Sequence, residues 1–355
     1  MRRIAASLAL LLAAAPAPGR AQQAYPWQGE GVAVPVDSSA RPRVASRAVA
    51  GAALTVSDID RSVRFYEDVL TFSAVSDRVV GGPAWEALTG VKGARIRMVD
   101  LVLGEEHLRL MQFLDTPGRP APTDMQSNDR WFQHVAIIVR DMDSAYARLD
   151  SAGVRRVSPS PQTLPATIPA AAGIRAFYFL DPDGHPLEIL AFPPDKGAAR
   201  WHTPSDQLFL GIDHTAIVVW DTDRSLAFYA NLLGLDVKGE SMNAGPEQAR
   251  LNNVPSARLR ITGVRAAAGP GVEFLDYRAP RTGRPYPSDE RSSDLAHWQT
   301  LIVVDDVDIA LALARAQGVR VVSRSVVTLD PAATGFRRAV IIRDPDGHAV
   351  ELVAH

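Results

Sequence analysis

The sequence contains no cysteine, so no disulfide bond is available and the stability of the fold must come from burial alone. The sequence also lacks a marked excess of either charge sign, because 38 basic and 40 acidic residues leave a net charge of -2. This balance gives no indication of nucleic acid or an anionic membrane as a partner. No apolar run is long enough to span a bilayer, so we expect no membrane association of the mature chain. The length of 355 residues allows two domains of ordinary size.

The first 21 residues have the composition of a secretory signal peptide. Arg2 and Arg3 form a charged start, an apolar run follows over residues 5–15, and Ala21 ends a small-x-small cleavage pattern. We therefore expect a protein that is exported to the periplasm or secreted after cleavage near Ala21. Residues 22–45 are rich in Pro, Gln, Ser and Ala and are predicted to form a flexible lead-in.

A strand pattern that ends in aspartate recurs four times, at residues 51–58, 134–141, 214–221 and 299–306. The closing aspartates lie 83, 80 and 85 residues apart. Repetition at this period indicates a supersecondary unit copied four times. In each copy a helix and then further short strands follow, which predicts a β-α-β-β-β module. The first residue of the pattern is Gly, His, His and Gln in modules 1 to 4.

The four modules are of two kinds. Modules 1 and 3 share the helix motif Arg-Ser-x-x-Phe-Tyr at residues 61–66 and 224–229, and modules 2 and 4 share the turn Asp-Pro-Asp-Gly-His at 181–185 and 344–348. This alternation indicates that a pair of modules was duplicated whole. It predicts an N-terminal domain over residues 46–192, a linker over 193–210 and a C-terminal domain over 211–355.

These motifs resemble those of the vicinal oxygen chelate superfamily, which includes glyoxalase I, bleomycin- and fosfomycin-resistance proteins and extradiol dioxygenases. The resemblance rests on His-x-Ala-Ile-x-Val-x-Asp, on the Arg-Ser-x-x-Phe-Tyr helix and on Asp-Pro-Asp-Gly-His-x-x-Glu, and it covers nearly all of residues 46–355. It implies an α+β fold in which four βαβββ modules pair into two glyoxalase-like domains with cupped mixed sheets. It also implies metal ligands on the first and last strands of paired modules.

With modules paired 1+2 and 3+4, the ligand positions of the C-terminal domain hold His214, Glu273, Gln299 and Glu351. An imidazole, an amide oxygen and two carboxylates suit a divalent first-row ion, and a dication offsets the charge of two buried glutamates. We therefore predict a divalent metal ion here (Zn, Ni, Co, Mn or Fe).

The ligand positions of the N-terminal domain hold Gly51, Arg109, His134 and Glu188. A glycine offers no ligand atom, and an arginine places a cation where the family places an anion, so a structural role is expected for this set. Pairing modules 2 and 3 would instead collect His134, Glu188, His214 and Glu273. The alternation of module types favours the first pairing, but the sequence leaves the second one open.

Other polar residues are weaker candidates. Arg258 and Arg260 share a strand face and are candidates for anchoring a substrate, although a solvated or ion-paired face is the stronger expectation. His297 lies on the same strand face as Gln299 and is a second candidate for that ligand position. His185 and His348 follow tight turns and are predicted to stabilise them.

By resemblance, the leading hypothesis is a metal-dependent lyase or isomerase of glyoxalase type. It would act on a small oxygenated substrate through a metal-bound enolate or enediolate, with Glu351 or Glu273 moving the proton. The alternatives are an extradiol-type non-haem iron dioxygenase and a non-catalytic small-molecule-binding protein of the resistance type. The dioxygenase pattern needs a second histidine and a tyrosine where module 4 has Gln299 and Ile341, which disfavours it. We expect a monomer or a homodimer.

Overall fold

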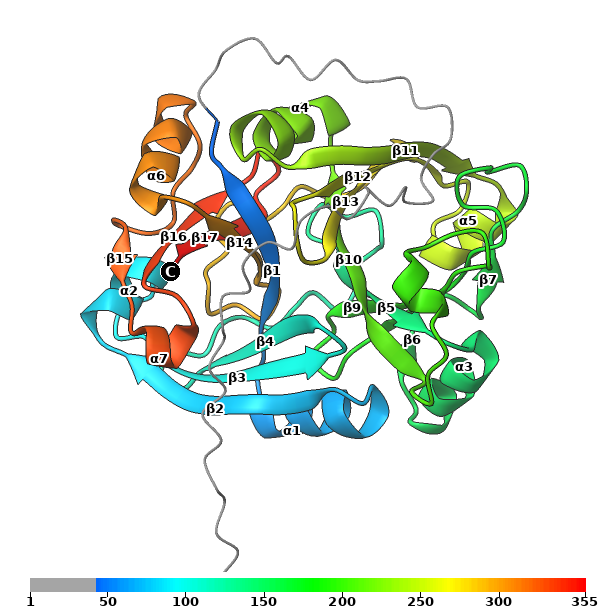
Figure 1. Cartoon of the computed structure of the whole chain (residues 1–355), viewed down its shortest axis with the longest axis horizontal. Helices are drawn as coiled ribbons and strands as arrows, with labels where there is room; N and C mark the ends of the chain where they lie inside the picture. Colours follow the sequence, from blue (N-terminus) through cyan, green and yellow to red (C-terminus); the bar gives the residue numbers. More distant parts are fainter. Residues whose placement is uncertain (1–42) are drawn as a thin grey trace, which may run out of the picture.

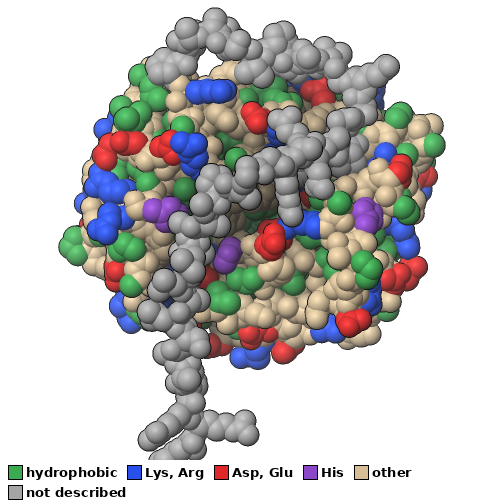
Figure 2. Space-filling model, in the orientation of Figure 1, with side chains coloured by type: hydrophobic (Ala, Val, Ile, Leu, Met, Phe, Trp, Pro, Cys, Tyr) green, Lys and Arg blue, Asp and Glu red, His purple; other side chains and the backbone are tan. Residues whose placement is uncertain are grey.

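The computed structural model describes residues 43–355, so the predicted signal peptide 1–21 and nearly all of the lead-in 22–45 lie outside the described residues. Within the described part, no helix combines the length and the apolar character needed to cross a membrane. Side chains of both charge signs are interspersed over the described surface on the face in Figure 2.

The elements repeat the predicted order of strand, helix and further strands in every module. Module 1 contains β1 (Ser46–Thr55), α1 (Ile59–Arg64) with a π-helix (Phe65–Val69), β2 (Ser73–Gly81), α2 (Pro83–Thr89), β3 (Arg95–Leu103) and β4 (Glu106–Phe113). Module 2 contains β5 (Gln133–Val139), α3 (Met142–Ser151), β6 (Arg155–Arg156), β7 (Gln162–Thr163), β8 (Arg175–Leu180) and β9 (Pro186–Ala191). A 3-10 helix (Ala199–His202) lies in the linker.

Modules 3 and 4 follow the same plan. Module 3 contains β10 (Phe209–Val219), α4 (Thr222–Leu226) with a π-helix (Ala227–Leu232), β11 (Asp236–Ala244), α5 (Pro246–Asn252), β12 (Arg258–Arg265) and β13 (Gly271–Ala279). Module 4 contains β14 (Trp298–Val304), α6 (Val307–Ala316), β15 (Val327–Thr328), α7 (Pro331–Thr334), β16 (Arg338–Arg343) and β17 (Ala349–Ala354). The predicted α+β class and the four modules are thus confirmed.

The aspartates that close the four strand patterns start the four first helices. The side chains of these residues accept a hydrogen bond from the backbone N–H three positions later, which makes them N-caps: Asp58, Asp141, Asp221 and Asp306. An N-cap acceptor satisfies one of the amides that the first helical turn leaves free. The recurrence of aspartate therefore has a structural cause in every module.

The pairing of the modules differs from the leading prediction. Strand β1 of module 1 pairs with β14 of module 4, and β5 of module 2 pairs with β10 of module 3, both antiparallel. An eight-stranded sheet consequently joins modules 1 and 4, and a nine-stranded sheet joins modules 2 and 3. Figure 1 shows the orange and red strands of module 4 beside the blue and cyan strands of module 1. The prediction that each half of the sequence forms its own sheet is therefore wrong.

Each sheet curls around an inner face with its own apolar cluster. We call the inner face of the eight-stranded sheet cup A and that of the nine-stranded sheet cup B. Cup A is lined by residues such as Trp85, Ile96 and Ile341, and cup B by residues such as Leu259 and Tyr277. A further cluster contains residues from both sheets, which holds the two cups together as one body.

Two histidines clamp the sheets to each other. Nδ1 of His185 lies 2.8 Å from Asp181 in its own turn, and Nε2 lies 2.8 Å from the carbonyl oxygen of Leu295, just before β14. His348 repeats this arrangement with Asp344 at 2.8 Å and with the carbonyl oxygen of Arg130, just before β5, at 2.7 Å. Each ring therefore stabilises its turn, as predicted, and also ties the end of one sheet to the loop that enters the other.

The hydrogen bonds of His185 and His348 predict that the stability of the fold depends on pH. Burial opposes the charge of both rings, but the adjacent aspartates outweigh it and raise the pKa of His185 and His348. A raised histidine pKa contributes stability below the unfolded-state pKa of about 6.5 and loses it as pH rises through the folded-state pKa. We expect His185→Gln to lower the free energy of unfolding by about 2 kcal/mol at pH 6, and less at pH 9. Denaturant titrations at both pH values measure this difference, and a loss independent of pH would contradict it.

Candidate metal centre

Four strands of cup B bring four metal-ligating side chains to one place. His134 on β5 lies opposite Ala216 of β10, and His214 on β10 lies opposite Ala136 of β5, so the two histidines are diagonal neighbours on one face. The adjoining parallel strands add the carboxylates, with Glu188 of β9 opposite Ala136 and Glu273 of β13 opposite Ala216. The two alanines between these side chains leave space at the centre of the group.

The closest set consists of His134, Glu188 and His214, whose ligand atoms all lie within 4.8 Å of one another. Oε2 of Glu188 lies 3.1 Å from Nε2 of His134 and 3.8 Å from Nε2 of His214. Oε2 of Glu273 lies 3.6 Å from Nε2 of His214, at the side of the cluster. Exposed fractions of 0, 4, 5 and 7% for His134, Glu188, His214 and Glu273 show that all four are buried.

The cluster contains buried nitrogen atoms without hydrogen-bond partners. Among residues 43–355, Nδ1 of His134 and Nε2 of His214 have no hydrogen-bond partner, while Nε2 of His134 lies 3.1 Å from Oε2 of Glu188. Buried polar atoms are normally satisfied, so these nitrogens indicate a missing partner. Two imidazole nitrogens and a carboxylate around a shared centre fit a divalent first-row metal ion.

A buried carboxylate fixes the orientation of His214. Nδ1 of His214 lies 3.0 Å from Oδ2 of Asp213, which also accepts a hydrogen bond of 2.8 Å from Arg265. Asp213 accepts a third hydrogen bond, of 3.2 Å, from Nε1 of Trp201 in the 3-10 helix of the linker. With Nδ1–H bonded to Asp213, Nε2 is the ring nitrogen that faces the cluster, as in carboxylate–histidine–metal triads.

The protonation states follow from burial and from these contacts. Burial lowers the pKa of His134, which favours a neutral ring with a lone pair. Burial also opposes the charge on His214, but Glu273 and Asp213 outweigh it and raise its pKa to about 9. Burial raises the pKa of Glu273 to about 7, so this carboxyl group can exchange a proton near neutral pH.

Cup A contains the other predicted ligand positions, but its residue types differ from those of cup B. In register, Gln299 and Arg109 lie opposite Ala53, and Gly51 and Glu351 lie opposite Leu301. The predicted set of His214, Glu273, Gln299 and Glu351 is therefore wrong as a set, because it is divided between two sheets. The alternative set from modules 2 and 3 is the one that the structure brings together.

Cup A cannot take a fourth ligand at position 51. Gly51 has a φ of +134°, and a Cβ atom there would lie 2.2 Å from the carbonyl oxygen of His107. Leu301 replaces the small Ala136 at the centre, and Arg109 forms an ion pair with Asp100 at 2.7 Å. Gln299 donates a hydrogen bond of 2.7 Å to Glu351. In cup A these side chains therefore pair with neighbouring residues.

The remaining predicted candidates lie away from the cluster. Arg260 pairs with Asp223 and Glu240, as expected for an ion-paired face, and Arg258 is exposed. Their neighbours Leu259 and Ile261 line cup B, so the two arginines point to the outer face. His297 holds Gln299 at 3.0 Å and Glu290 at 2.6 Å, which places it in the network of cup A.

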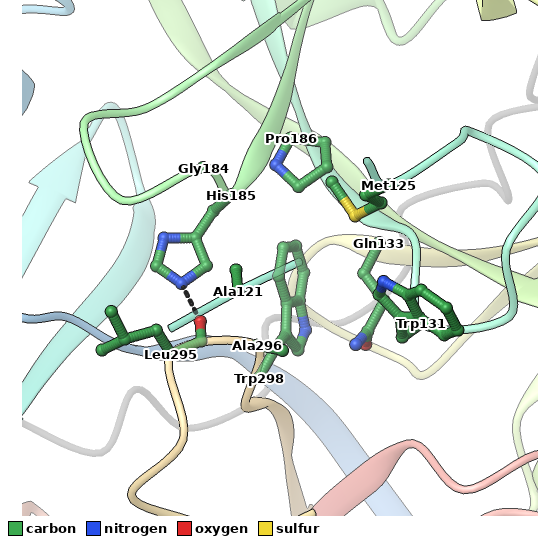
Figure 3. Close-up of a pocket in the computed structure, with 10 residues that line it drawn as sticks. All are labelled: Ala121, Met125, Trp131, Gln133, Gly184, His185, Pro186, Leu295, Ala296 and Trp298. Carbon is green, nitrogen blue, oxygen red and sulfur yellow. Dashed lines mark hydrogen bonds between the residues drawn. The ribbon is translucent and has the colours of Figure 1, made fainter. Parts of the chain in front are cut away.

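A separate small pocket lies between the two sheets. Its walls include Trp131, Gln133, Trp298 and His185, and Figure 3 shows the hydrogen bond from the His185 ring to Leu295 at one side. Gln133 precedes His134 on β5 and therefore faces away from cup B. None of the four residues of the cluster lines this pocket.

A comparison with protein families agrees with the architecture. The model of the Glyoxalase/Bleomycin resistance protein/Dioxygenase superfamily matches residues 48–189 and 211–352. The chain belongs to this superfamily. The two matches cover the two halves of the sequence, so each sheet combines one module from each match. No curated protein matches the chain.

Solved structures show the same superfamily fold. Glyoxalase I from Zea mays is 16% identical with a TM-score of 0.56, and the similarity covers 87% of this chain and 92% of that one. A putative dioxygenase from Bacillus subtilis is 14% identical with a TM-score of 0.53, covering 88% and 86%. At these identities the likeness concerns the fold alone.

Proposed function

We propose that this superfamily member is a metal-dependent lyase or isomerase acting on a small oxygenated substrate. The observation that carries the proposal is the buried cluster of His134, Glu188 and His214, in which Nε2 of each imidazole faces the same carboxylate oxygen of Glu188. These three residues would hold the ion, and Glu273 lies beside them. When bound, a divalent ion supplies Lewis acidity, which stabilises negative charge on a neighbouring substrate oxygen.

Residues of the chain would transfer the proton and orient the metal-binding histidine. Oε2 of Glu273 takes a proton from the substrate carbon and returns it to that carbon or to its neighbour, because this carboxylate lies 3.6 Å from His214 at the side of the cluster. Asp213, itself bonded to Arg265 and Trp201, keeps His214 in the orientation that directs Nε2 inward. Burial of the four side chains excludes bulk water from the proton transfer.

The same cluster favours one second candidate, an iron-dependent dioxygenase. Two histidines and one carboxylate form the facial triad that is typical of non-haem iron oxygenases, and this is the composition of the closest set. Tyr178 lies three residues before Asp181 in module 2, where the dioxygenase pattern expects a tyrosine. The objections from Gln299 and Ile341 concern cup A only.

The metal and its chemistry distinguish these functions. Protein purified without an affinity tag is analysed for metal content, and the exchange of carbon-bound protons of hydroxyacetone is followed by NMR in D₂O with and without a chelator. The lyase or isomerase predicts about one zinc, nickel, cobalt or manganese ion per chain and exchange that the chelator abolishes. Iron with consumption of oxygen supports the dioxygenase. A metal-free chain that catalyses no exchange after reconstitution contradicts both and supports a non-catalytic binder.

Export remains part of the proposal. The charged and apolar pattern of residues 1–21 supports it, and N-terminal sequencing of the protein recovered from a periplasmic extract tests it. Processing near Ala21 is the expected result, and an intact cytoplasmic chain would contradict it.

A further inference from the structure

Cup B contains a second group of polar side chains, beyond the candidate metal centre of His134, Glu188 and His214. Tyr178 on β8, Tyr277 on β13 and Asn252 at the end of α5 have exposed fractions of 4, 5 and 0%. In the described part of the chain, the hydroxyl of Tyr277 and Nδ2 of Asn252 have no hydrogen-bond partner. An unpaired polar atom in a buried position destabilises the fold, so these groups call for a function other than stability.

The group extends from the metal cluster towards the surface. Tyr178 lies opposite Glu188 in the β8–β9 pair, and its ring centroid is 4.7 Å from that of His134. Burial raises the pKa of both tyrosines, and the amide of Asn252 beside each hydroxyl acts in the opposite direction. Tyr277 shares a strand face with Glu273 at a separation of roughly 13 Å along β13. It also lines a surface pocket beside Val218 and the partly exposed Trp220.

A chain of amides fixes the direction of Asn252. Its Oδ1 accepts a hydrogen bond from Nε2 of Gln248, and Oε1 of Gln248 accepts one of 2.9 Å from Asn243. Asn243 in turn accepts a bond of 2.8 Å from the hydroxyl of Ser241. Because Oδ1 of Asn252 faces Gln248, its NH₂ group points towards the tyrosine hydroxyls and offers hydrogen-bond donors there.

Cup A provides an internal control, because most of the same positions are apolar there. The shared registers match Tyr178 with Ile341 and Tyr277 with Phe113. Along the equivalent strand–helix segments, Asn243, Gln248 and Asn252 correspond to Val80, Trp85 and Thr89. The hydroxyl of Thr89 is used within its own helix, since it donates to the carbonyl of Trp85 at 2.7 Å. The two tyrosine hydroxyls and the amide beside them thus occur in the cup with the candidate metal centre, and Ile341, Phe113 and Thr89 occupy the corresponding positions of cup A.

We propose that Asn252, Tyr277 and Tyr178 bind the end of the substrate that lies away from the metal, and that this end carries a neutral hydrogen-bond acceptor, a carbonyl or hydroxyl oxygen. The proposal rests on the proposed function, because it takes the cluster as the place of reaction. The three side chains are uncharged, and a buried charged group would need a counter-charge that they do not provide. Arg130 and Arg281 also line the pocket beside Tyr277, but they already pair with Asp346 at 3.3 Å and with Asp276 at 3.8 Å. The substrate class is therefore an uncharged oxygenated molecule.

Hydroxamates test this proposal, since they bind metal ions through two neighbouring oxygens. Calorimetry compares benzohydroxamate with its 4-acetamido and 4-carboxylate derivatives on the metal-loaded protein. We expect the acetamido compound to bind about tenfold more tightly than the parent, from one added hydrogen bond, and the carboxylate to bind more weakly. Tyr277→Phe and Asn252→Thr introduce the residues of cup A. They should remove the tenfold preference while leaving the affinity for benzohydroxamate unchanged.

Thermal melting without ligand separates binding from folding. Tyr277→Phe is expected to keep or raise the Tm, by up to about 4 °C, because it removes an unpaired buried hydroxyl. The matched control Phe113→Tyr in cup A should lower the Tm without changing hydroxamate binding. A metal-loaded chain that binds the three hydroxamates equally, or a Tyr277→Phe variant with a lower Tm and an unchanged preference, overturns this proposal alone. Failure to take up any dication overturns the proposed function instead, and metal analysis of the same samples shows which has failed.

Discussion

Glu188→Gln is expected to abolish metal retention and catalysis, whereas Glu351→Gln leaves both nearly unchanged. Glu188 places one carboxylate oxygen 3.1 Å from His134 and 3.8 Å from His214, so the substitution removes the one anion within residues 43–355 that pairs with both imidazoles. Outer-shell partners of metal ligands already contribute 10–100-fold to affinity, so loss of a ligand should weaken binding at least about 100-fold. Competition titrations with a chromophoric chelator measure the affinity of both variants.

Glu351 is the matched control because it holds the corresponding position of cup A. It is buried, and Gln299 donates a hydrogen bond to it at 2.7 Å, so Glu351→Gln tests whether any buried glutamate at the end of a module matters. His214→Ala should resemble Glu188→Gln, and Gln299→Ala should resemble Glu351→Gln. Equal losses from Glu188→Gln and Glu351→Gln would count against a single metal centre in cup B.

Glu273→Gln is expected to slow proton transfer strongly while the metal is retained. General acid–base groups typically contribute 10²–10⁴-fold, so exchange of the carbon-bound protons of hydroxyacetone should fall by about that factor. Glu273 lies at the side of the cluster, 3.6 Å from His214, and the group of His134, Glu188 and His214 that could hold a metal ion does not include it. The glutamine keeps the size of the side chain and removes its ability to accept the proton.

Two measurements on one sample test this role. Metal content should stay near that of the unsubstituted protein, and the exchange rate measured by NMR should drop. A Glu273→Gln protein that exchanges protons at the original rate would assign the proton transfer to another group. If the Glu273→Gln protein also loses its metal, Glu273 is a metal ligand itself.

The sequence predicted the modules and the ligand positions because both follow from local patterns. Asp58, Asp141 and their two copies cap helices through contacts three residues away, and such contacts are visible in a linear pattern. The alignment of Glu273 with Arg109 is also confirmed, since both lie opposite an alanine of the neighbouring first strand. Strand alternation alone then places the candidate side chains on the inner faces.

The pairing of the modules could not be predicted in the same way. All four first strands have nearly the same apolar pattern, so each can form an antiparallel ladder with any other, and the free-energy difference lies in contacts distant in sequence. The leading hypothesis relied on duplication order, which records ancestry and does not determine which strands pair. As a result His134 and Glu188 were assigned a structural role although they form the centre of the cluster with His214.

The contact between Asp213 and His214 could not be predicted from the sequence either, because it depends on an irregularity in β10. Alternation places Asp213 and His214 on opposite faces of a regular strand, but β10 has a register shift between Ile212 and His214 that disturbs this alternation. Asp213 thereby comes within 3.0 Å of Nδ1 of its neighbour. Trp201 belongs to a segment that was predicted to be only a linker, and no pattern in the sequence connects it with Asp213.

Crystals of the metal-loaded protein, measured at the absorption edge of the ion found by metal analysis, test the central claim most directly. The account predicts one anomalous peak per chain, between Nε2 of His134, Nε2 of His214 and the carboxylate of Glu188. A peak beside Glu351 and Gln299, or a second peak of equal height in cup A, would contradict it.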